Sequence, residues 1–89
     1  MKKVLIIGTG GIGRRHIRGY LGTERAELSV VEPHPKRREE VMSEYPIAQA
    51  FTDIKEADLE GFDLAVICAP AHVHITVMKS CIEADLPFM

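Results

Sequence analysis

Three glycines near the amino terminus, Gly8, Gly10 and Gly13, have the spacing G-x-G-x-x-G and directly follow the apolar run 4–7. Backbone N–H groups in such a turn can bind phosphate when a strand precedes the turn and a helix follows it. The first glycine permits the tight turn, the second lets the backbone approach a pyrophosphate, and the third lets the helix pack closely on the strand. We therefore expect a dinucleotide to bind at this turn, on the residues Gly8, Gly10, Gly11, Ile12 and Gly13.

A strand-to-helix turn that binds nothing is the competing interpretation of these glycines. Such a turn needs one glycine, and each glycine inside an ordered element costs roughly 0.5–1 kcal/mol relative to alanine. A second glycine at the place where a ligand would lie has no other evident use. The pattern therefore favours the dinucleotide.

An acidic residue, Glu32, follows Gly13 by 19 residues and stands at the end of the second predicted strand. A carboxylate at that place accepts hydrogen bonds from the adenosine ribose hydroxyls and repels a 2′-phosphate, which favours NAD(H) over NADP(H). The cations at 36–38 leave an alternative open, because they either receive a 2′-phosphate or form a solvated first helical turn with the two glutamates that follow them.

The elements that must position these residues alternate along the chain. The runs 4–7 and 64–68 are continuously apolar, as in strands buried on both faces. Residues 28–31 predict a further strand, and 47–51 predicts a weaker one. Helices are expected over 11–21, 35–45 and 72–84, with a short capped turn at 53–56. The alternation predicts an α/β fold, a Rossmann-type doubly wound parallel sheet of strand order 3-2-1-4, with the start of a fifth strand at 86–89 beside the fourth. The residues expected to face inward from the three helices are Ile12, Ile17, Tyr20 and Leu21, then Val41, Met42 and Tyr45, then His74, Val77, Met78, Cys81 and Ile82.

Length and composition describe one domain, residues 1–89, of an ordinary globular chain, with 46% hydrophobic residues and a formal charge of −2. Neither the charge nor the few aromatic residues favour a nucleic-acid or membrane partner. No apolar run is long enough for a membrane span or a signal sequence, so we expect a cytoplasmic protein with reduced thiols at Cys68 and Cys81. The histidines lack the acidic neighbours of a metal site, and no nucleophile motif is present.

Longer stretches of the sequence add a family resemblance to this interpretation. GTGGIGRRHIRGY at 8–20 is similar to a G-x-G-x-x-G-x-x-H pattern with His16 at the histidine, and DLAVICAPAHVHITVMKSCIEADLPF at 63–88 is similar to a strand followed by [T/A]-P-x-x-x-H and a helix, where Ala69, Pro70 and His74 match. Together with Glu32, these stretches resemble the N-terminal part of the glucose-fructose oxidoreductase/inositol dehydrogenase/MocA (Gfo/Idh/MocA) family of oxidoreductases.

The resemblance implies a nicotinamide cofactor, and it implies that the second motif, the one after the fourth strand, lies along this cofactor. In such proteins the turn after the fourth strand passes the nicotinamide half, which would put Ala69, Pro70 and His74 near it. Helix packing is an equal alternative for His74. The first position of the motif is often threonine, so Ala69 lacks a hydroxyl that could contact the cofactor.

The resemblance also implies that a catalytic lysine, in a Glu-Lys-Pro motif, and a substrate domain follow the fifth strand, beyond Met89. We therefore expect a truncated dinucleotide-binding domain that binds its cofactor weakly and catalyses nothing alone, with no catalytic residue assigned. The parent would be a dehydrogenase acting on a CH–OH group of a sugar or cyclitol. The alternatives are a stand-alone redox-sensing module without catalysis and a degenerate domain that binds nothing. An exposed sheet edge at 86–89 would favour a homo-oligomer.

Overall fold

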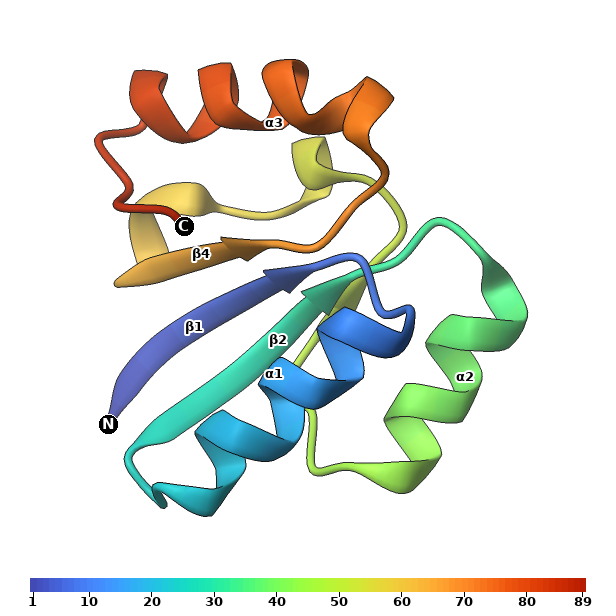
Figure 1. Cartoon of the computed structure of the whole chain (residues 1–89). Helices are drawn as coiled ribbons and strands as arrows, with labels where there is room; N and C mark the ends of the chain where they lie inside the picture. Colours follow the sequence, from blue (N-terminus) through green and yellow to red (C-terminus); the bar gives the residue numbers. More distant parts are fainter.

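The fold is a parallel sheet with helices on both faces (Figure 1), and the computed structural model describes all of residues 1–89. Four strands pair in the order β3-β2-β1-β4, which confirms the predicted order 3-2-1-4 and the Rossmann-type fold. The elements in chain order are β1 (Lys2–Ile7), α1 (Gly11–Gly22), β2 (Ala26–Val31), α2 (Pro35–Glu44), β3 (Ala50–Phe51), the short 3₁₀ turns Ile54–Glu56 and Leu59–Gly61, β4 (Leu64–Ile67) and α3 (Ala71–Glu83).

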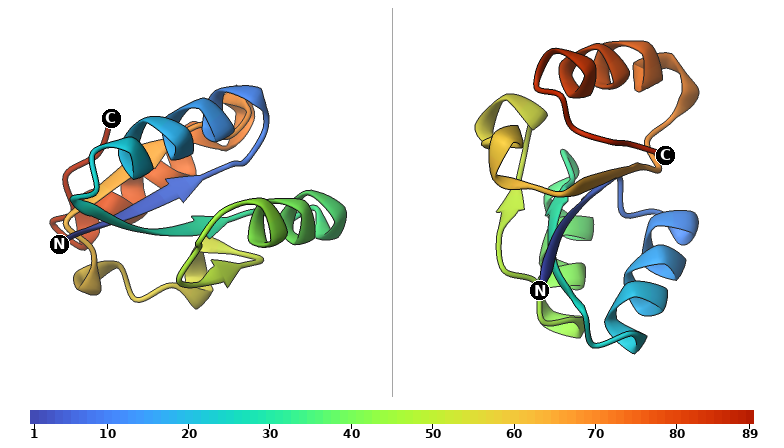
Figure 2. Two further views of the ribbon diagram at one scale, coloured as in Figure 1. Left: turned by 90° about the horizontal axis from the view of Figure 1, so that it is seen from below. Right: turned by 90° about the vertical axis from the view of Figure 1, so that its left-hand side faces the viewer.

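The central strand β1 divides the core into two layers, because successive side chains of a strand point to opposite faces. Val4 and Ile6 face the side that α1 and α2 cover, where they pack with Ile17 and Val41. Leu5 and Ile7 face the opposite side, where α3 supplies Val77 and Cys81. Figure 2 shows the helices on the two sides of the twisted sheet. Burial on both faces explains the continuous apolar runs 4–7 of β1 and 64–67 of β4.

The register of the sheet brings the carboxyl ends of three strands together. Ile7 at the end of β1 pairs with Val31 at the end of β2 and with Ile67 at the end of β4. The turns that follow these strands therefore meet at one edge of the sheet. In open α/β sheets, this edge is where ligands bind.

Residues 86–89 lie beside β4, as the sequence predicts. A parallel bridge joins Phe88 to Ala65. The N–H groups of Ala65 and Ile67 donate to the carbonyl oxygens of Pro87 (2.9 Å) and Met89 (2.8 Å). The outer side of this segment remains open, since the Phe88 N–H has no backbone partner within the chain.

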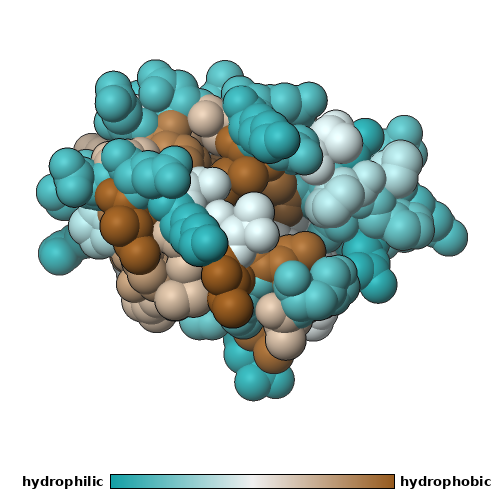
Figure 3. All heavy atoms as spheres, turned by 90° about the horizontal axis from the view of Figure 1, so that it is seen from above, coloured by the Kyte–Doolittle hydropathy of each residue, from teal (hydrophilic) through white to brown (hydrophobic).

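Four helical residues that the periodicity places inward are exposed instead, namely Ile12, Met42, Met78 and Ile82. The helices touch the sheet along narrow lines, Val41 on α2 and Val77 with Cys81 on α3, so residues one position off each line reach solvent. The first turn of α1, which contains Ile12, extends past the tip of β1 (Figure 1). Along α3, Ile75, Met78 and Ile82 form an exposed apolar stripe, on the side of the molecule that Figure 3 views.

The third strand is shorter than expected, but it pairs with β2 as the predicted strand order requires. In the parallel ladder between β2 and β3, Val30 pairs with Ala50 and Val31 pairs with Phe51. The Ala48 N–H adds a hydrogen bond to the Leu28 carbonyl oxygen. The predicted cap at Asp53 is confirmed, since its carboxylate accepts a hydrogen bond from the Lys55 N–H. No helix has the length and hydrophobicity needed to cross a membrane.

Candidate cofactor-binding site

The glycine turn lies where the carboxyl ends of β1, β2 and β4 meet. Gly8 continues the β1 ladder by donating its N–H to the Val31 carbonyl oxygen at 2.8 Å. Gly8 also lies against the residues that follow β4, because a Cβ on Gly8 would be 2.8 Å from the Cys68 carbonyl carbon and 2.9 Å from the Ala69 nitrogen. The structure thus brings the glycine turn next to the Ala69-Pro70 turn, the second of the two sequence motifs.

Gly8 and Gly13 are both required by the geometry of the turn. Gly8 has φ +97°, a backbone conformation that residues with a side chain rarely adopt. A Cβ on Gly13 would lie far inside contact distance of the Gly8 carbonyl oxygen. These two glycines therefore hold the start of α1 close to the end of β1, as the sequence pattern predicts.

Gly10 differs from these two, because the protein itself does not need a glycine there. Its backbone is in the ordinary extended region, with φ −70° and ψ −165°, and a Cβ would meet nothing within 4 Å. The space beside Gly10 is open, which is the arrangement that a ligand approaching the backbone requires.

The start of α1 offers a group of hydrogen-bond donors without partners. The N–H groups of Gly10, Gly11, Ile12 and Gly13 have no acceptor in the chain, and Gly10 provides no side-chain cap. No acidic side chain stands in the first turn of α1 to occupy them. Together with the positive end of the helix dipole, these donors suit an anionic group such as a pyrophosphate.

Glu32 lies one residue beyond β2 and is 4% exposed. Its Oε1 accepts hydrogen bonds from the Thr9 N–H at 2.8 Å and from the Thr9 hydroxyl at 2.7 Å. Its Oε2 accepts a bond from the His34 N–H at 3.0 Å. A carboxylate has roughly four acceptor positions, so Oε2 keeps about one for an outside donor such as a ribose hydroxyl.

The surroundings of Glu32 keep it ionised although it is buried. Burial raises the pKa of its carboxyl group, but the hydrogen bonds from His34 and Thr9 and the charge of Arg37 outweigh burial and bring the pKa below the ordinary value of 4.5. At neutral pH the site therefore carries a buried negative charge.

The lowered pKa of Glu32 predicts how stability changes with pH. The folded chain holds a proton on Glu32 less tightly than the unfolded chain, so its ionised form stabilises the fold fully above pH 4.5 and loses this contribution as the pH falls through the lowered pKa. We expect Glu32→Gln to lower the free energy of unfolding by about 1–3 kcal/mol at pH 7. This gap should shrink when urea unfolding is repeated at pH 4 and pH 3. A difference in unfolding free energy between wild type and Glu32→Gln that is equal at pH 7 and pH 3 would contradict this pH dependence.

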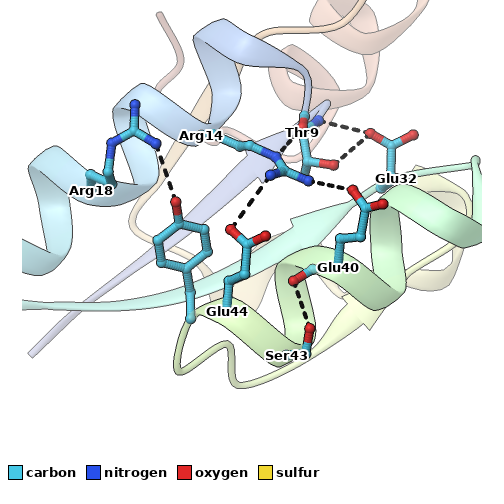
Figure 4. A network of polar contacts seen from close by, with 8 residues as sticks. Thr9, Arg14, Arg18, Glu32, Glu40, Ser43 and Glu44 are labelled. Carbon is cyan, nitrogen blue, oxygen red and sulfur yellow. Dashed lines mark hydrogen bonds and ion pairs between the residues drawn. The ribbon is translucent and has the colours of Figure 1, made fainter.

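Two residues of the site are not part of the predicted set, Thr9 and Arg14. Figure 4 shows Thr9 between Glu32 and Arg14. Arg14 Nε donates to the Thr9 carbonyl oxygen at 3.4 Å, and its guanidinium forms ion pairs with Glu40 (2.9 Å) and Glu44 (3.5 Å) of α2. Arg14 therefore joins α1 to α2. The sequence does contain a signal for Thr9 as a site residue. It is a hydroxyl residue beside the first glycine, and it faces an acid at the end of the adjacent parallel strand.

The cations at 36–38 have different surroundings. Arg38 Nη1 donates to the main-chain oxygen of Glu32 at 2.8 Å and to that of Pro33 at 3.5 Å, so it stabilises the turn between β2 and α2. Lys36 and Arg37 are exposed. The expected glutamate partners are not used, since Arg38 bonds to main-chain oxygens and Glu40 pairs with Arg14.

The second motif forms the turn from β4 into α3. Pro70 is the N-cap residue of α3, and Ala69 precedes it beside Gly8. His74 Nε2 lies 2.5 Å from the Ala69 carbonyl oxygen, and since a carbonyl only accepts, the ring donates through this nitrogen. His74 thus fastens the first turn of α3 to the strand end.

Known proteins match nearly the whole chain in sequence. Residues 2–88 match the family described as "Oxidoreductase family, NAD-binding Rossmann fold". The chain is 33% identical over 90 residues to an inositol 2-dehydrogenase from Corynebacterium glutamicum, an alignment that covers 98% of this chain and 27% of that protein. The chain thus spans about a quarter of the length of the curated relatives it matches.

Solved structures share the fold at low sequence identity. A Gfo/Idh/MocA family oxidoreductase from Vibrio cholerae superimposes with a TM-score of 0.90 at 22% identity, over 99% of this chain and 29% of the other. A scyllo-inositol dehydrogenase from Lactobacillus casei, with bound NAD(H) and scyllo-inositol, gives 0.85 at 21% identity, over 99% and 27%. With the family match over nearly its whole length, the chain belongs to the Gfo/Idh/MocA oxidoreductase family, as part of its NAD-binding Rossmann domain.

Proposed function

We propose that this chain is the NAD(H)-binding part of a dehydrogenase that acts on a CH–OH group of a sugar or cyclitol-like substrate. The observation that carries the proposal is the group of four unpartnered N–H groups at the start of α1, beside the open space at Gly10. When bound, the nicotinamide would accept a hydride from the carbon that bears the hydroxyl.

The substrate class is supported by the relatives rather than by residues of this chain. One relative is an inositol 2-dehydrogenase, and a structural neighbour binds scyllo-inositol together with NAD(H). Inositols are rings of CH–OH groups. The family match also favours the dehydrogenase over a stand-alone NAD-binding or redox-sensing module.

Each part of the cofactor has a proposed place at the carboxyl edge of the sheet. The turn from Gly8 to Gly13, with Gly10, Gly11 and Ile12 inside it, would bind the pyrophosphate. Oε2 of Glu32 would accept a hydrogen bond from the adenosine ribose. Ala69 and Pro70 would border the nicotinamide half, with His74 holding the Ala69 carbonyl in place. We propose that residues 1–89 form one domain. Groups for proton transfer and substrate binding would lie outside these residues.

The charge of Glu32 predicts a preference between the two nicotinamide cofactors. A buried carboxylate beside the ribose repels a 2′-phosphate, and Arg38 is bonded to main-chain oxygens. In calorimetric titrations of the chain we expect saturable binding of NADH and binding of NADPH at least about tenfold weaker, a difference of about 1.4 kcal/mol. Glu32→Ala should reduce the difference.

Two outcomes of these titrations would contradict the proposal. Equal or tighter binding of NADPH would overturn the role given to Glu32. The absence of any NADH binding to a chain that circular dichroism shows to be folded would overturn the site on these residues.

We further propose a cytoplasmic location and self-association. Both cysteines are free, which suits a reducing compartment. The open outer side of residues 86–89 would pair with a second copy of the chain. Sedimentation that shows only monomer at high concentration would contradict this pairing.

A further inference from the structure

Thr9 lies between the first two glycines of the turn and has no exposed surface. Its N–H and its hydroxyl both donate to Glu32 Oε1, at 2.8 and 2.7 Å. Its carbonyl oxygen accepts a hydrogen bond from Arg14 Nε at 3.4 Å, as Figure 4 shows. Every polar group of Thr9 is therefore bonded, and the residue is held on both sides.

The spacing of the glycines does not itself require a hydroxyl between them. An alanine at position 9 would still offer the N–H to Glu32, and the turn would still have its glycines. The threonine hydroxyl adds a second donor to the same carboxylate oxygen. Bonds of this kind, to an ionised acceptor, are about twice as strong as bonds between neutral groups. They join the turn after β1 to the end of β2 across 23 residues of sequence.

The two bonds from Thr9 also decide which carboxylate oxygen is available to a ligand. Oε1 receives two donors from Thr9, which fills its usual capacity. Oε2 receives one donor, the His34 N–H, and keeps about one acceptor position. With one oxygen filled and the other half-filled, the carboxylate has a fixed orientation before any ligand arrives.

We propose that Thr9 is a positioning residue of the NAD site, which fastens the glycine turn to Glu32 and leaves Oε2 as the oxygen that receives a ribose hydroxyl. This inference rests on the proposed binding of NAD at the turn. Thr9 itself does not touch the cofactor. It acts by keeping the turn and the carboxylate in the arrangement that binds, which reduces the ordering required on binding.

The charged groups around Glu32 come from two helices. Arg14 on α1 bonds to Thr9, while Arg37 and Arg38 on α2 lie near the carboxylate and its main-chain oxygen. The adjoining β3 strand contributes only the Phe51 carbonyl oxygen, which accepts the Glu32 N–H at 2.8 Å. A substitution of Thr9 leaves all of these groups in place, so its effect reports the hydroxyl.

Two variants of Thr9 test the proposal. Thr9→Val keeps the shape and the N–H but removes the hydroxyl, whereas Thr9→Ser keeps the hydroxyl. We expect Thr9→Val to weaken NADH binding by about threefold to tenfold, because fewer molecules hold the turn in the binding arrangement. In carbon NMR of the Glu32 carboxyl group, the pKa should rise in Thr9→Val. In Thr9→Ser, the dissociation constant for NADH should stay within about twofold of wild type, and the pKa of Glu32 within about 0.3 pH units.

A control variant, Thr76→Val, accompanies the two Thr9 variants, and the outcomes distinguish a failure of the role of Thr9 from a failure of the proposed function. Thr76→Val removes an exposed hydroxyl on α3 and should change neither quantity. Unchanged NADH binding and an unchanged Glu32 pKa in a folded Thr9→Val would overturn the role of Thr9. If wild type itself fails to bind NADH, the proposed function fails. The NMR titration then still reports the Thr9–Glu32 link, and a pKa that Thr9→Val leaves unchanged would overturn that link separately.

Discussion

Gly13→Ala is expected to unfold the chain or to leave it barely stable. The added Cβ would lie far inside contact distance of the Gly8 carbonyl oxygen, and both partners of this clash are backbone. Forcing extra atoms into a packed site costs typically 1–3 kcal/mol and occasionally more. Because the clash separates α1 from β1 at the centre of the sheet, we expect a loss of at least about 3 kcal/mol, which for a domain of this size lowers the midpoint of thermal unfolding by more than about ten degrees.

The matched control for this prediction lies on the same helix. Gly19 is exposed, and a Cβ there would meet nothing within 4 Å. Gly19→Ala should raise the free energy of unfolding by up to about 1 kcal/mol, since alanine favours a helix more than glycine does. Thermal unfolding followed by circular dichroism would compare the two variants. A Gly13→Ala chain as stable as wild type would mean that α1 does not pack on β1 as closely as the structure has it.

Gly10→Val is expected to have the opposite profile, with a normal fold and little or no cofactor binding. The backbone of Gly10 is in an ordinary extended conformation, and the space that a side chain would occupy contains no protein atoms. The free energy of unfolding should therefore fall by no more than about 1 kcal/mol, the difference between glycine and valine at an N-cap position. The valine side chain would fill the space beside the free N–H groups, and NADH binding should weaken by at least about a hundredfold.

Calorimetric titration of wild type, Gly10→Val and Gly19→Ala with NADH would measure this effect. Gly19→Ala should bind as wild type does, because Gly19 lies two turns away from the free N–H groups along α1. A folded Gly10→Val chain that binds NADH with the wild-type dissociation constant would remove the glycine turn from the cofactor site. Together, the two glycine substitutions separate the residue that the fold needs from the residue that the ligand needs.

The strand order and the site edge were predictable from sequence because their signals are local. Continuous apolar runs such as Val4–Ile7 mark strands covered on both faces, and strands that alternate with helices leave few ways to connect them. The glycine spacing is a local signal too, since the turn after β1 is made of neighbouring residues. These features depend on short stretches of chain, so they could be predicted before any packing was known.

The surroundings of Glu32 and the exposed helix residues depend on contacts between distant segments. Sequence places Glu32 at a strand end, but which donors reach its carboxylate is decided by the register between β1 and β2, which brings the Thr9 N–H within 2.8 Å. The periodicity of α3 likewise gives the direction of its apolar side but not its width. Met78 and Ile82 are exposed because only the line through Val77 and Cys81 meets the sheet.

The central position of β1 affects the order in which the protein is completed during synthesis. Of the four strands, β1 leaves the ribosome first, yet one of its two neighbours, β4, follows about 60 residues later, as the pairing of Ile7 with Ile67 requires. Contacts so distant in sequence form late, because the intervening chain must first be made and its ends brought together. The glycine turn rests against the residues that follow β4. Although the turn precedes most of residues 1–89 in the chain, it gains its full support only when more than three quarters of them have been synthesised.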